Sequence, residues 1–151
     1  MNFRVMSRRQ IEQSNPLLVP HVIISIRNPE SPVPRVVQTK KTKGVLYMQF
    51  DDLHSPKLAT IRAMGYVVLF NEEMADQIID FVKKHEQEIE YIVCHCEMGV
   101  SRSAAVAAAL AQFYNGDNRE FFGSGIYGSS RYSPNMLVYD ILSKKLNLSR
   151  Q

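Results

Sequence analysis

Two cysteines and a histidine stand almost side by side in the stretch VCHCEMGVSRSA, which covers residues 93–104. Side chains that bind metals or act as nucleophiles are thereby concentrated in one place, and Arg102 follows just before a run of alanines. The stretch is compatible with a metal site, a disulfide, a buried strand or a reactive thiol. These four interpretations predict different surroundings for Cys94, His95 and Cys96.

A disulfide or a zinc ion fits the spacing of these residues poorly. Residues i and i+2 of a strand face the same side, but such neighbours seldom have the geometry of a disulfide. His95 would point to the face opposite both cysteines, so the three side chains cannot surround one tetrahedral ion. The other histidines, His21, His54 and His85, form no second cluster. We therefore favour a reactive thiol at the end of a buried strand, with Cys94 packed in the core.

Strands and helices are predicted to alternate along the chain. Apolar and β-branched runs predict strands at residues 3–6, 21–26, 45–50 and 91–94. Capping residues and helical periodicity predict helices that start after Ser7, at 55–63, from Asn71 to His85, at 104–114, and from Ser133 to Leu146. Residues 66–70 are either an extended connection or an extra strand, and residues 115–133 contain no clear element. The alternation predicts an α/β fold, a three-layer α/β/α domain with a largely parallel central sheet, which comprises residues 1–151 as a single domain.

The composition excludes several classes of protein. The chain has 151 residues, of which 45% are hydrophobic and 22% charged, as in ordinary soluble globular domains. No apolar run is long enough to span a bilayer, and the opening MNFRVMSRRQ is too polar for a signal peptide. We therefore expect a cytoplasmic monomer without a membrane partner. The net charge of +3 is too small to argue for a nucleic-acid partner.

The opening stretch combines a predicted strand, a tight loop and the start of a predicted helix. Ligands of open parallel sheets bind at the C-terminal ends of the central strands, and a helix N-terminus with its loop amides attracts anions. Cysteine thiols in such positions have pKa values lowered to about 3.5–7.5. Arg102 adds a guanidinium that matches two oxygens of a phosphoryl or sulfuryl group. A thiolate below an anion and a guanidinium beside it indicate nucleophilic displacement at phosphorus.

Residues 95–103, HCEMGVSRS, resemble the H-C-x5-R-S signature loop of the cysteine-dependent protein phosphatases, and look most like the dual-specificity branch. The resemblance is sharp over residues 93–104 and looser over residues 20–146. It implies a dual-specificity phosphatase-like fold, hydrolysis of phosphate monoesters through a phosphocysteine intermediate, and no metal or organic cofactor. The partner that it implies is a phosphorylated protein, with phosphotyrosine as the main substrate and phosphoserine and phosphothreonine as further ones.

The resemblance also implies a role for each residue of the loop. Cys96 is the expected nucleophile, and Arg102 is expected to hold the phosphoryl oxygens. Ser103 is expected to donate a hydrogen bond to the thiolate, and His95 to order the loop. The backbone amides of the phosphate-binding loop complete the expected site, and its residues are Glu97, Met98, Gly99, Val100, Ser101 and Arg102.

The general acid of this family is an aspartate on a loop after an upstream strand. Asp51 and Asp52 follow the predicted strand that ends at Phe50. We expect Asp52 to be the acid and keep Asp51 as the alternative. On a continued strand their side chains face opposite ways, so only one of them should reach the site. Asp76 and Asp80 lie inside a predicted helix and fit less well.

Three other functions compete with a protein phosphatase. A phosphatase fold without its acid would bind phosphate or phosphoproteins without turnover, and a phosphatase of RNA 5′ ends or nucleotides would use the same loop. A rhodanese-like sulfurtransferase also uses a loop cysteine, but Arg102 followed by Ser103 favours phosphate. Because Glu97, Met98 and Val100 are acidic or apolar where phosphoinositide phosphatases often carry lysines, a lipid substrate is not favoured.

Overall fold

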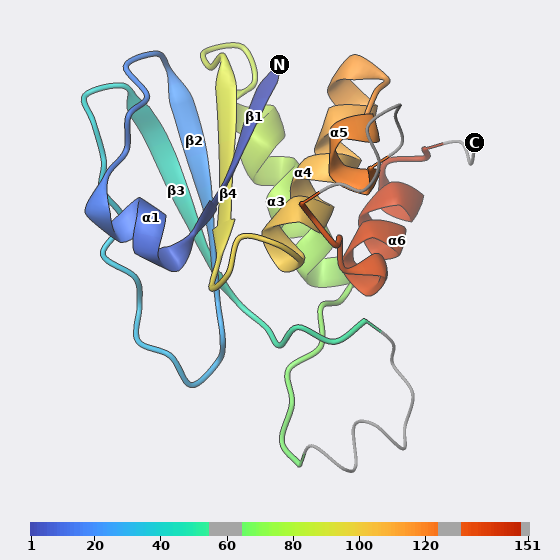
Figure 1. Ribbon diagram of the computed structural model, residues 1–151. Helices are drawn as coiled ribbons and strands as arrows, with labels where there is room; N and C mark the ends of the chain where they lie inside the picture. Colours follow the sequence, from blue (N-terminus) through green and yellow to red (C-terminus); the bar gives the residue numbers. More distant parts are fainter. Residues whose placement is uncertain (55–64, 124–130, 149–151) are drawn as a thin grey trace.

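A computed structural model describes residues 1–54, 65–123 and 131–148. Its centre is a sheet of parallel strands in the order β1-β4-β2-β3 (Figure 1). The strands are β1 (Asn2–Ser7), β2 (His21–Arg27), β3 (Thr42–Gln49) and β4 (Tyr91–Cys96). The helices are α1 (Arg8–Gln13), α3 (Glu72–His85), α4 (Arg102–Asn115), α5 (Arg119–Phe122) and α6 (Met136–Lys145).

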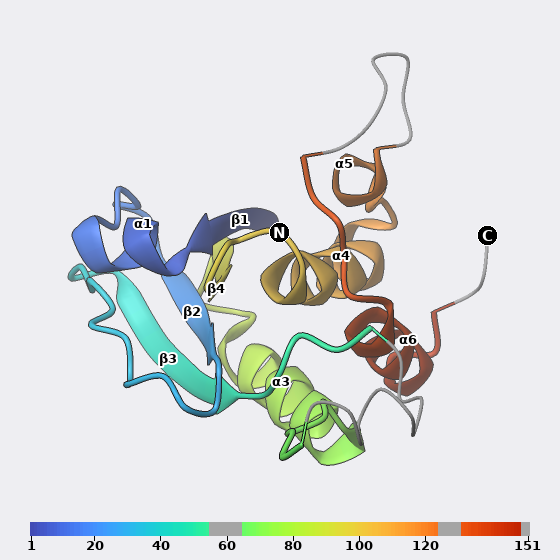
Figure 2. The same cartoon turned by 60° about the horizontal axis from the view of Figure 1, so that its bottom comes forward.

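Helices cover both faces of the sheet. Figure 2 shows α1 on one side and α3, α4 and α6 on the other. Each side has its own apolar core. The core under α1 consists of Met6, Ile11, Leu17, Ile23 and Val93. The larger core lies between the sheet and the remaining helices. This arrangement confirms the three-layer α/β/α fold class, with every strand pair parallel.

Strand β4 and helix α4 form the centre of the molecule. Strand β4 pairs with β1 on one side and β2 on the other, so both its edges are occupied. Helix α4 is buried from Arg102 to Ala111, because its alanine-rich sequence lets it pack close to the sheet. The loop between them, residues 97–101, therefore leaves the carboxyl end of an interior strand and enters the N-terminus of a buried helix. That edge of a parallel sheet is where ligands usually bind.

Most of the predicted elements are confirmed with shifts of a few residues. The capping box at Ser7 and Gln10 starts α1, and Asn71 caps α3. Gly116 ends α4 in a left-handed conformation. Residues 66–70 form no strand, which settles that ambiguity in favour of a connection without regular structure. The helix predicted at 55–63 lies outside the described residues.

Two predicted features were wrong. The last helix was expected to start at Ser133, but it starts at Met136, and Asn135 is its N-cap. Residues 115–133 were expected to contain no clear element, yet α5 lies within them. This four-residue helix is too short to show a helical periodicity. Within the described parts of the chain, no helix is both long and apolar enough to cross a bilayer.

Candidate active site

The sulfur of Cys96 lies at the carboxyl end of β4 and has two polar neighbours. Its Sγ is 3.0 Å from the Ser103 hydroxyl oxygen and accepts a hydrogen bond of 3.3 Å from the Gly99 N–H. The side chain is 2% exposed. The first residues of the loop therefore fold back toward the sulfur that precedes them. The Gly99 N–H donates to this sulfur, and the Ser103 hydroxyl can do so as well.

Gly99 makes this close turn of the loop geometrically feasible. Its φ is +70°, in the region that favours glycine, and a Cβ there would lie 2.8 Å from the Met6 carbonyl carbon and from the Ser7 nitrogen. The loop is thus pressed against the end of β1. A backbone hydrogen bond of 3.2 Å from Arg8 N–H to the Glu97 carbonyl fixes the same approach. Both the backbone conformation and the lack of space require glycine at this position.

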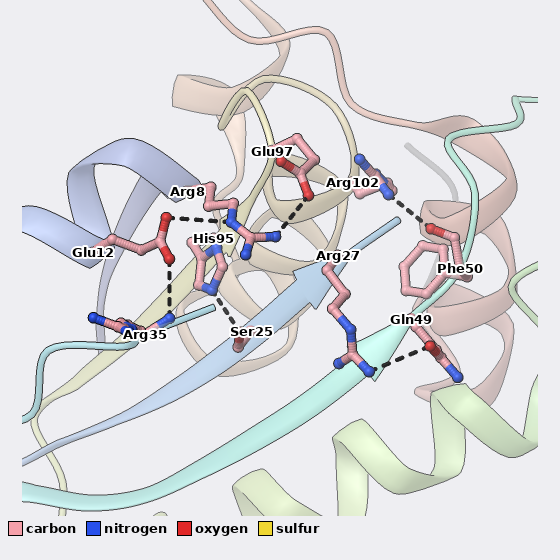
Figure 3. A network of polar contacts seen from close by, with 10 residues as sticks. All are labelled: Arg8, Glu12, Ser25, Arg27, Arg35, Gln49, Phe50, His95, Glu97 and Arg102. Carbon is pink, nitrogen blue, oxygen red and sulfur yellow. Dashed lines mark hydrogen bonds and ion pairs between the residues drawn. The ribbon is translucent and has the colours of Figure 1, made fainter. Parts of the chain in front are cut away.

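Arg102 is buried, and it has no anionic partner within residues 1–54, 65–123 and 131–148. Its side chain donates from Nη1 to the Phe50 carbonyl at 2.7 Å (Figure 3), and it is 4% exposed. Its Nε is buried and has no acceptor, and no carboxylate of the described residues forms an ion pair with it. A buried charge without a counter-charge is costly. This guanidinium at the start of α4 is therefore suited to receive an anion.

The structure brings Asp52 to the signature loop and leaves Asp51 away from it. Asp52 Oδ1 accepts a hydrogen bond of 2.8 Å from the Ser101 hydroxyl. The Asp51 carboxylate instead accepts the Val68 N–H at 2.7 Å, while its own N–H donates to the Val68 carbonyl. The two side chains thus have separate partners, and the choice of Asp52 over Asp51 as general acid stays a prediction.

Asn135 is a residue of this site to which the sequence pattern assigned no role. Its Nδ2 donates to Asp52 Oδ1 at 2.7 Å, and its backbone N–H donates to the Ser101 carbonyl at 3.1 Å. The Ser133 N–H donates to the neighbouring Val100 carbonyl at 2.9 Å. An asparagine directly before an apolar periodic segment is an N-cap signal, which could have located the helix start. That signal carries no indication of the contact with Asp52.

His95 lies on the opposite face of β4 from the two cysteines, as strand alternation predicts. It is fully buried, and its Nε2 is 2.6 Å from the Ser25 hydroxyl oxygen (Figure 3). Burial lowers the pKa of His95 from its ordinary 6.5 to about 4, although the Cys96 backbone acts in the opposite direction. The imidazole is therefore neutral near pH 7. Its contact with Ser25 links β4 to β2.

The outer loop residues have different surroundings. The Glu97 carboxylate is 3.4 Å from Arg8 Nη1, and the same guanidinium contacts Glu12 at 3.2 Å (Figure 3). Met98 is 77% exposed, so its side chain lies at the rim of the loop. Val100 is half-buried. Helix α1 thus holds one end of the loop through Glu97. The centre of the loop, at Met98, is open to solvent.

The arrangement can support nucleophilic chemistry on an oxyanion. The loop brings together the Cys96 thiol, the Asp52 carboxylate and the Arg102 guanidinium, which has no counter-charge in the described parts of the chain. The helix N-terminus adds unpaired N–H groups that attract negative charge. The loop that begins after Cys96 ends at Ser101, whose hydroxyl donates to Asp52, and Arg102 follows directly.

Comparisons with known proteins agree with this fold. No protein-family model matches the chain, and no curated protein matches it in sequence. Several solved structures do match it. Human DUSP28 is 17% identical, with 96% of this chain and 91% of that chain covered and a TM-score of 0.58. A mouse putative dual specificity phosphatase complexed with zinc tungstate is 17% identical, with 93% and 79% covered and a TM-score of 0.53. The PTP-2 phosphatase of Cydia pomonella is 21% identical, with 96% and 86% covered and a TM-score of 0.51.

These likenesses define the class of the fold. The chain has the fold of the dual-specificity and tyrosine phosphatases, which confirms the fold that the signature-loop resemblance implied.

Proposed function

We propose that this protein is a cysteine-dependent phosphatase that hydrolyses phosphate monoesters through a phosphocysteine intermediate. The observation that carries the proposal is the pairing of Cys96 with Arg102 across one loop. The sulfur is held by Ser103 and Gly99, and the buried guanidinium lacks an anionic partner among the described residues. A phosphoryl group bound by this guanidinium would supply the negative charge that the described residues do not provide.

In the first step, the Cys96 thiolate attacks phosphorus. The S–P bond forms while the P–O bond to the leaving group breaks, and Asp52 donates its proton to the leaving oxygen. Arg102 and the loop N–H groups bind the three non-bridging oxygens, over which the charge of the transition state is spread. The products of this step are an alcohol or phenol and the phosphocysteine.

In the second step, water attacks the phosphorus of the phosphocysteine. Asp52, now ionised, accepts a proton from that water, the S–P bond breaks, and its electron pair returns to sulfur. The Ser103 hydroxyl donates a hydrogen bond to the departing thiolate, which makes sulfur a better leaving group. Inorganic phosphate leaves, and both Cys96 and Asp52 are back in their starting states.

The substrate that we propose is phosphotyrosine on proteins, with phosphoserine and phosphothreonine as slower substrates. The support is chemical. Met98 at the rim is a soft apolar side chain that favours contact with an aromatic ring. Glu97 is acidic, so the loop offers no cation besides Arg102 for a second phosphate. Turnover of tyrosine-phosphorylated peptides should therefore exceed that of 5′-phosphorylated RNA; the reverse order would reject this substrate class.

The test is hydrolysis of para-nitrophenyl phosphate as a function of pH by the wild type and matched variants. Cys96→Ser should abolish turnover. Asp52→Asn should lose the basic limb of the pH–rate profile and reduce kcat by about 10²–10⁴-fold, the usual contribution of a general acid. Asp51→Asn should keep the basic limb, because its carboxylate contacts Val68. Cys94→Ala controls for removal of a sulfur from the same strand and should leave the profile unchanged.

The other outcomes identify the competing functions. Turnover by Cys96→Ser at the wild-type rate would reject the proposed nucleophile. No turnover by the wild type, with tungstate still bound, would indicate a phosphate-binding module. Sulfur transfer from thiosulfate to cyanide, without phosphatase activity, would indicate a sulfurtransferase.

A further inference from the structure

We infer that Asn135 is a positioning residue that holds the general acid Asp52 in one orientation and joins it to the nucleophile loop. The inference rests on the proposed function, since it assigns a part to a residue that acts through Asp52. It starts from the network of hydrogen bonds that converge on the Asn135 side chain, between the loop, the segment after β3 and the start of α6.

Every polar group of the Asn135 side chain is occupied. The residue is 0% exposed. Its Oδ1 accepts the Val138 N–H at 3.1 Å, and its Nδ2 donates to Asp52 Oδ1 at 2.7 Å and to the Leu53 carbonyl at 2.9 Å. Because a backbone N–H can only donate, the capping bond fixes which end of the amide is oxygen. The NH₂ group is therefore aimed at the segment that carries Asp52.

The same residue is tied to the nucleophile loop through its backbone. The Asn135 N–H donates to the Ser101 carbonyl at 3.1 Å, and the Ser101 hydroxyl donates to the same Asp52 oxygen at 2.8 Å. Asn135, Ser101 and Asp52 thus form a closed ring of contacts. A shift of the acid relative to the loop would break at least two of these hydrogen bonds.

The network distinguishes the two oxygens of the Asp52 carboxyl group. Oδ1 accepts two donors, whereas Oδ2 accepts no hydrogen bond from the described residues. A proton on Oδ1 would face two N–H or O–H donors, so the protonated acid carries its proton on Oδ2. Asn135 thereby selects the oxygen that delivers the proton to the leaving group.

The ionisable groups around this carboxylate include its chain neighbour Asp51, whose carboxylate accepts the Val68 N–H instead. His54, on the same segment, has its Nε2 3.7 Å from Asp52 Oδ1 and 3.3 Å from the Ser101 hydroxyl. From the loop side, Arg102 binds the Phe50 carbonyl two residues before Asp52. The first turn of α6 contains no acidic residue. A carboxylate introduced at position 135 would replace the Nδ2 donor that lies 2.7 Å from Asp52 Oδ1 and would place a negative charge there.

The experiment compares Asn135→Asp with the wild type in the pH dependence of kcat/KM for para-nitrophenyl phosphate. An aspartate at position 135 still accepts the Val138 N–H, so the helix cap is retained. It replaces the donor to Asp52 by a second carboxylate, and two close carboxyl groups resist ionising together. The general acid works only while it is protonated. If Asp52 loses its proton less readily, the basic limb of the pH–rate profile moves to higher pH. Asn71→Asp, at the N-cap of α3, is the matched control and should leave the limb in place.

A second variant tests the same inference in case Asn135→Asp does not fold. Asn135→Ser keeps a cap acceptor and removes the donor to Asp52. It should lower kcat/KM by about tenfold for phenyl phosphate, part of the total contribution of a general acid. The loss should be smaller for para-nitrophenyl phosphate, because the better leaving group needs less protonation.

The outcomes separate this inference from the proposed function. A basic limb that moves up in Asn135→Asp but not in Asn71→Asp supports the inference. An unmoved limb, with equal losses for the two substrates in Asn135→Ser, overturns it and leaves Asn135 as a helix cap only. Absence of turnover by the wild type overturns the proposed function itself, and the assignment of Asn135 with it.

Discussion

Cys94 and Cys96 share one face of β4 and have different chemical surroundings. Cys94 is fully buried in the apolar core, and burial, with a smaller effect of Cys96, raises the pKa of its thiol. Cys96 is at the point where the strand meets the loop, so it has the Ser103 hydroxyl and the Gly99 N–H as neighbours. The difference between a core thiol and a candidate nucleophile is thus produced by a shift of two residues along the strand.

His95 leads to a prediction about stability. Because burial lowers its pKa to about 4, the unfolded chain binds a proton between about pH 6.5 and pH 4 that the folded protein does not bind. The free energy of unfolding should therefore fall as pH drops through this range, by about 3 kcal/mol in total from this residue. Urea unfolding of the wild type and of His95→Asn at several pH values measures it.

The comparison with the variant isolates this residue from the other titrating groups. His95→Asn should have a lower stability at neutral pH but a shallower decline toward pH 4. Parallel declines in the two proteins would show that His95 takes up its proton equally well in the folded state.

The loop between β4 and α4 is the element on which the site depends most. Gly99 combines a positive φ with contact to the backbone of β1. Gly116, the C-cap of α4, has a similar φ of +68°, but a Cβ added there would have no atom within 4 Å. The two glycines therefore differ in available space and share their backbone conformation. They form a natural matched pair for substitution.

We predict that Gly99→Ala removes most of the phosphatase activity and that Gly116→Ala does not affect it. Both variants should lose about 1 kcal/mol of stability from the left-handed conformation. Gly99→Ala should lose about 1–3 kcal/mol more, because its methyl group displaces the loop from β1. Urea unfolding and kcat/KM for an aryl phosphate measure both effects. Equal activity losses in the two variants would contradict this explanation of Gly99.

The elements were predictable where their signals are local. The Ser7–Gln10 capping box and the acidic start and basic end of α3 lie within one helix each, and both helices are observed. The predicted start of α6 at Ser133 was wrong because contacts with a distant part of the chain decide where this helix begins. The N–H groups of Ser133 and Asn135 donate to the carbonyls of Val100 and Ser101, so this segment is held by the loop and enters the helix later.

The whole site is assembled from segments far apart in the chain. Cys96, Arg102 and Ser103 belong to one contiguous motif, so their proximity was predictable from the sequence. The contacts of the loop residue Ser101 with Asp52 and Asn135 were not equally predictable. Asp52 and Asn135 are 83 positions apart, and their contact depends on how the start of α6 packs against the segment after β3. The sequence contains only the residue types, whereas tertiary packing decides which of them meet.

At the scale of the molecule, we predict that a tetrahedral oxyanion stabilises the fold. Binding to the native state alone should add about 2.7 kcal/mol to the free energy of unfolding at a free tungstate concentration of about 100 times Kd. Arg102→Lys should lose most of this gain, because an ammonium cannot replace the fork of the guanidinium. Thermal and urea unfolding of both proteins, with and without tungstate, measure this stabilisation.

Arg27→Lys is the control for that experiment. Arg27 is a partly buried arginine at the carboxyl end of β2 that lies outside the loop of residues 97–101 and donates to Gln49 (Figure 3). Its variant should retain the stabilisation by tungstate. Equal losses in the two variants would mean that the anion binds through general positive charge rather than at the loop.

The most direct test of the central claim is to trap the covalent intermediate. Ser103→Ala removes the donor to the departing sulfur, so it should slow the second step and let the intermediate accumulate. The protein is quenched in acid during turnover of an aryl phosphate and mapped by mass spectrometry. We predict one phosphoryl group, on the peptide that contains Cys96 and at Cys96 itself, with none on Cys96→Ser. Turnover without this adduct, or an adduct on another residue, would contradict a phosphocysteine mechanism.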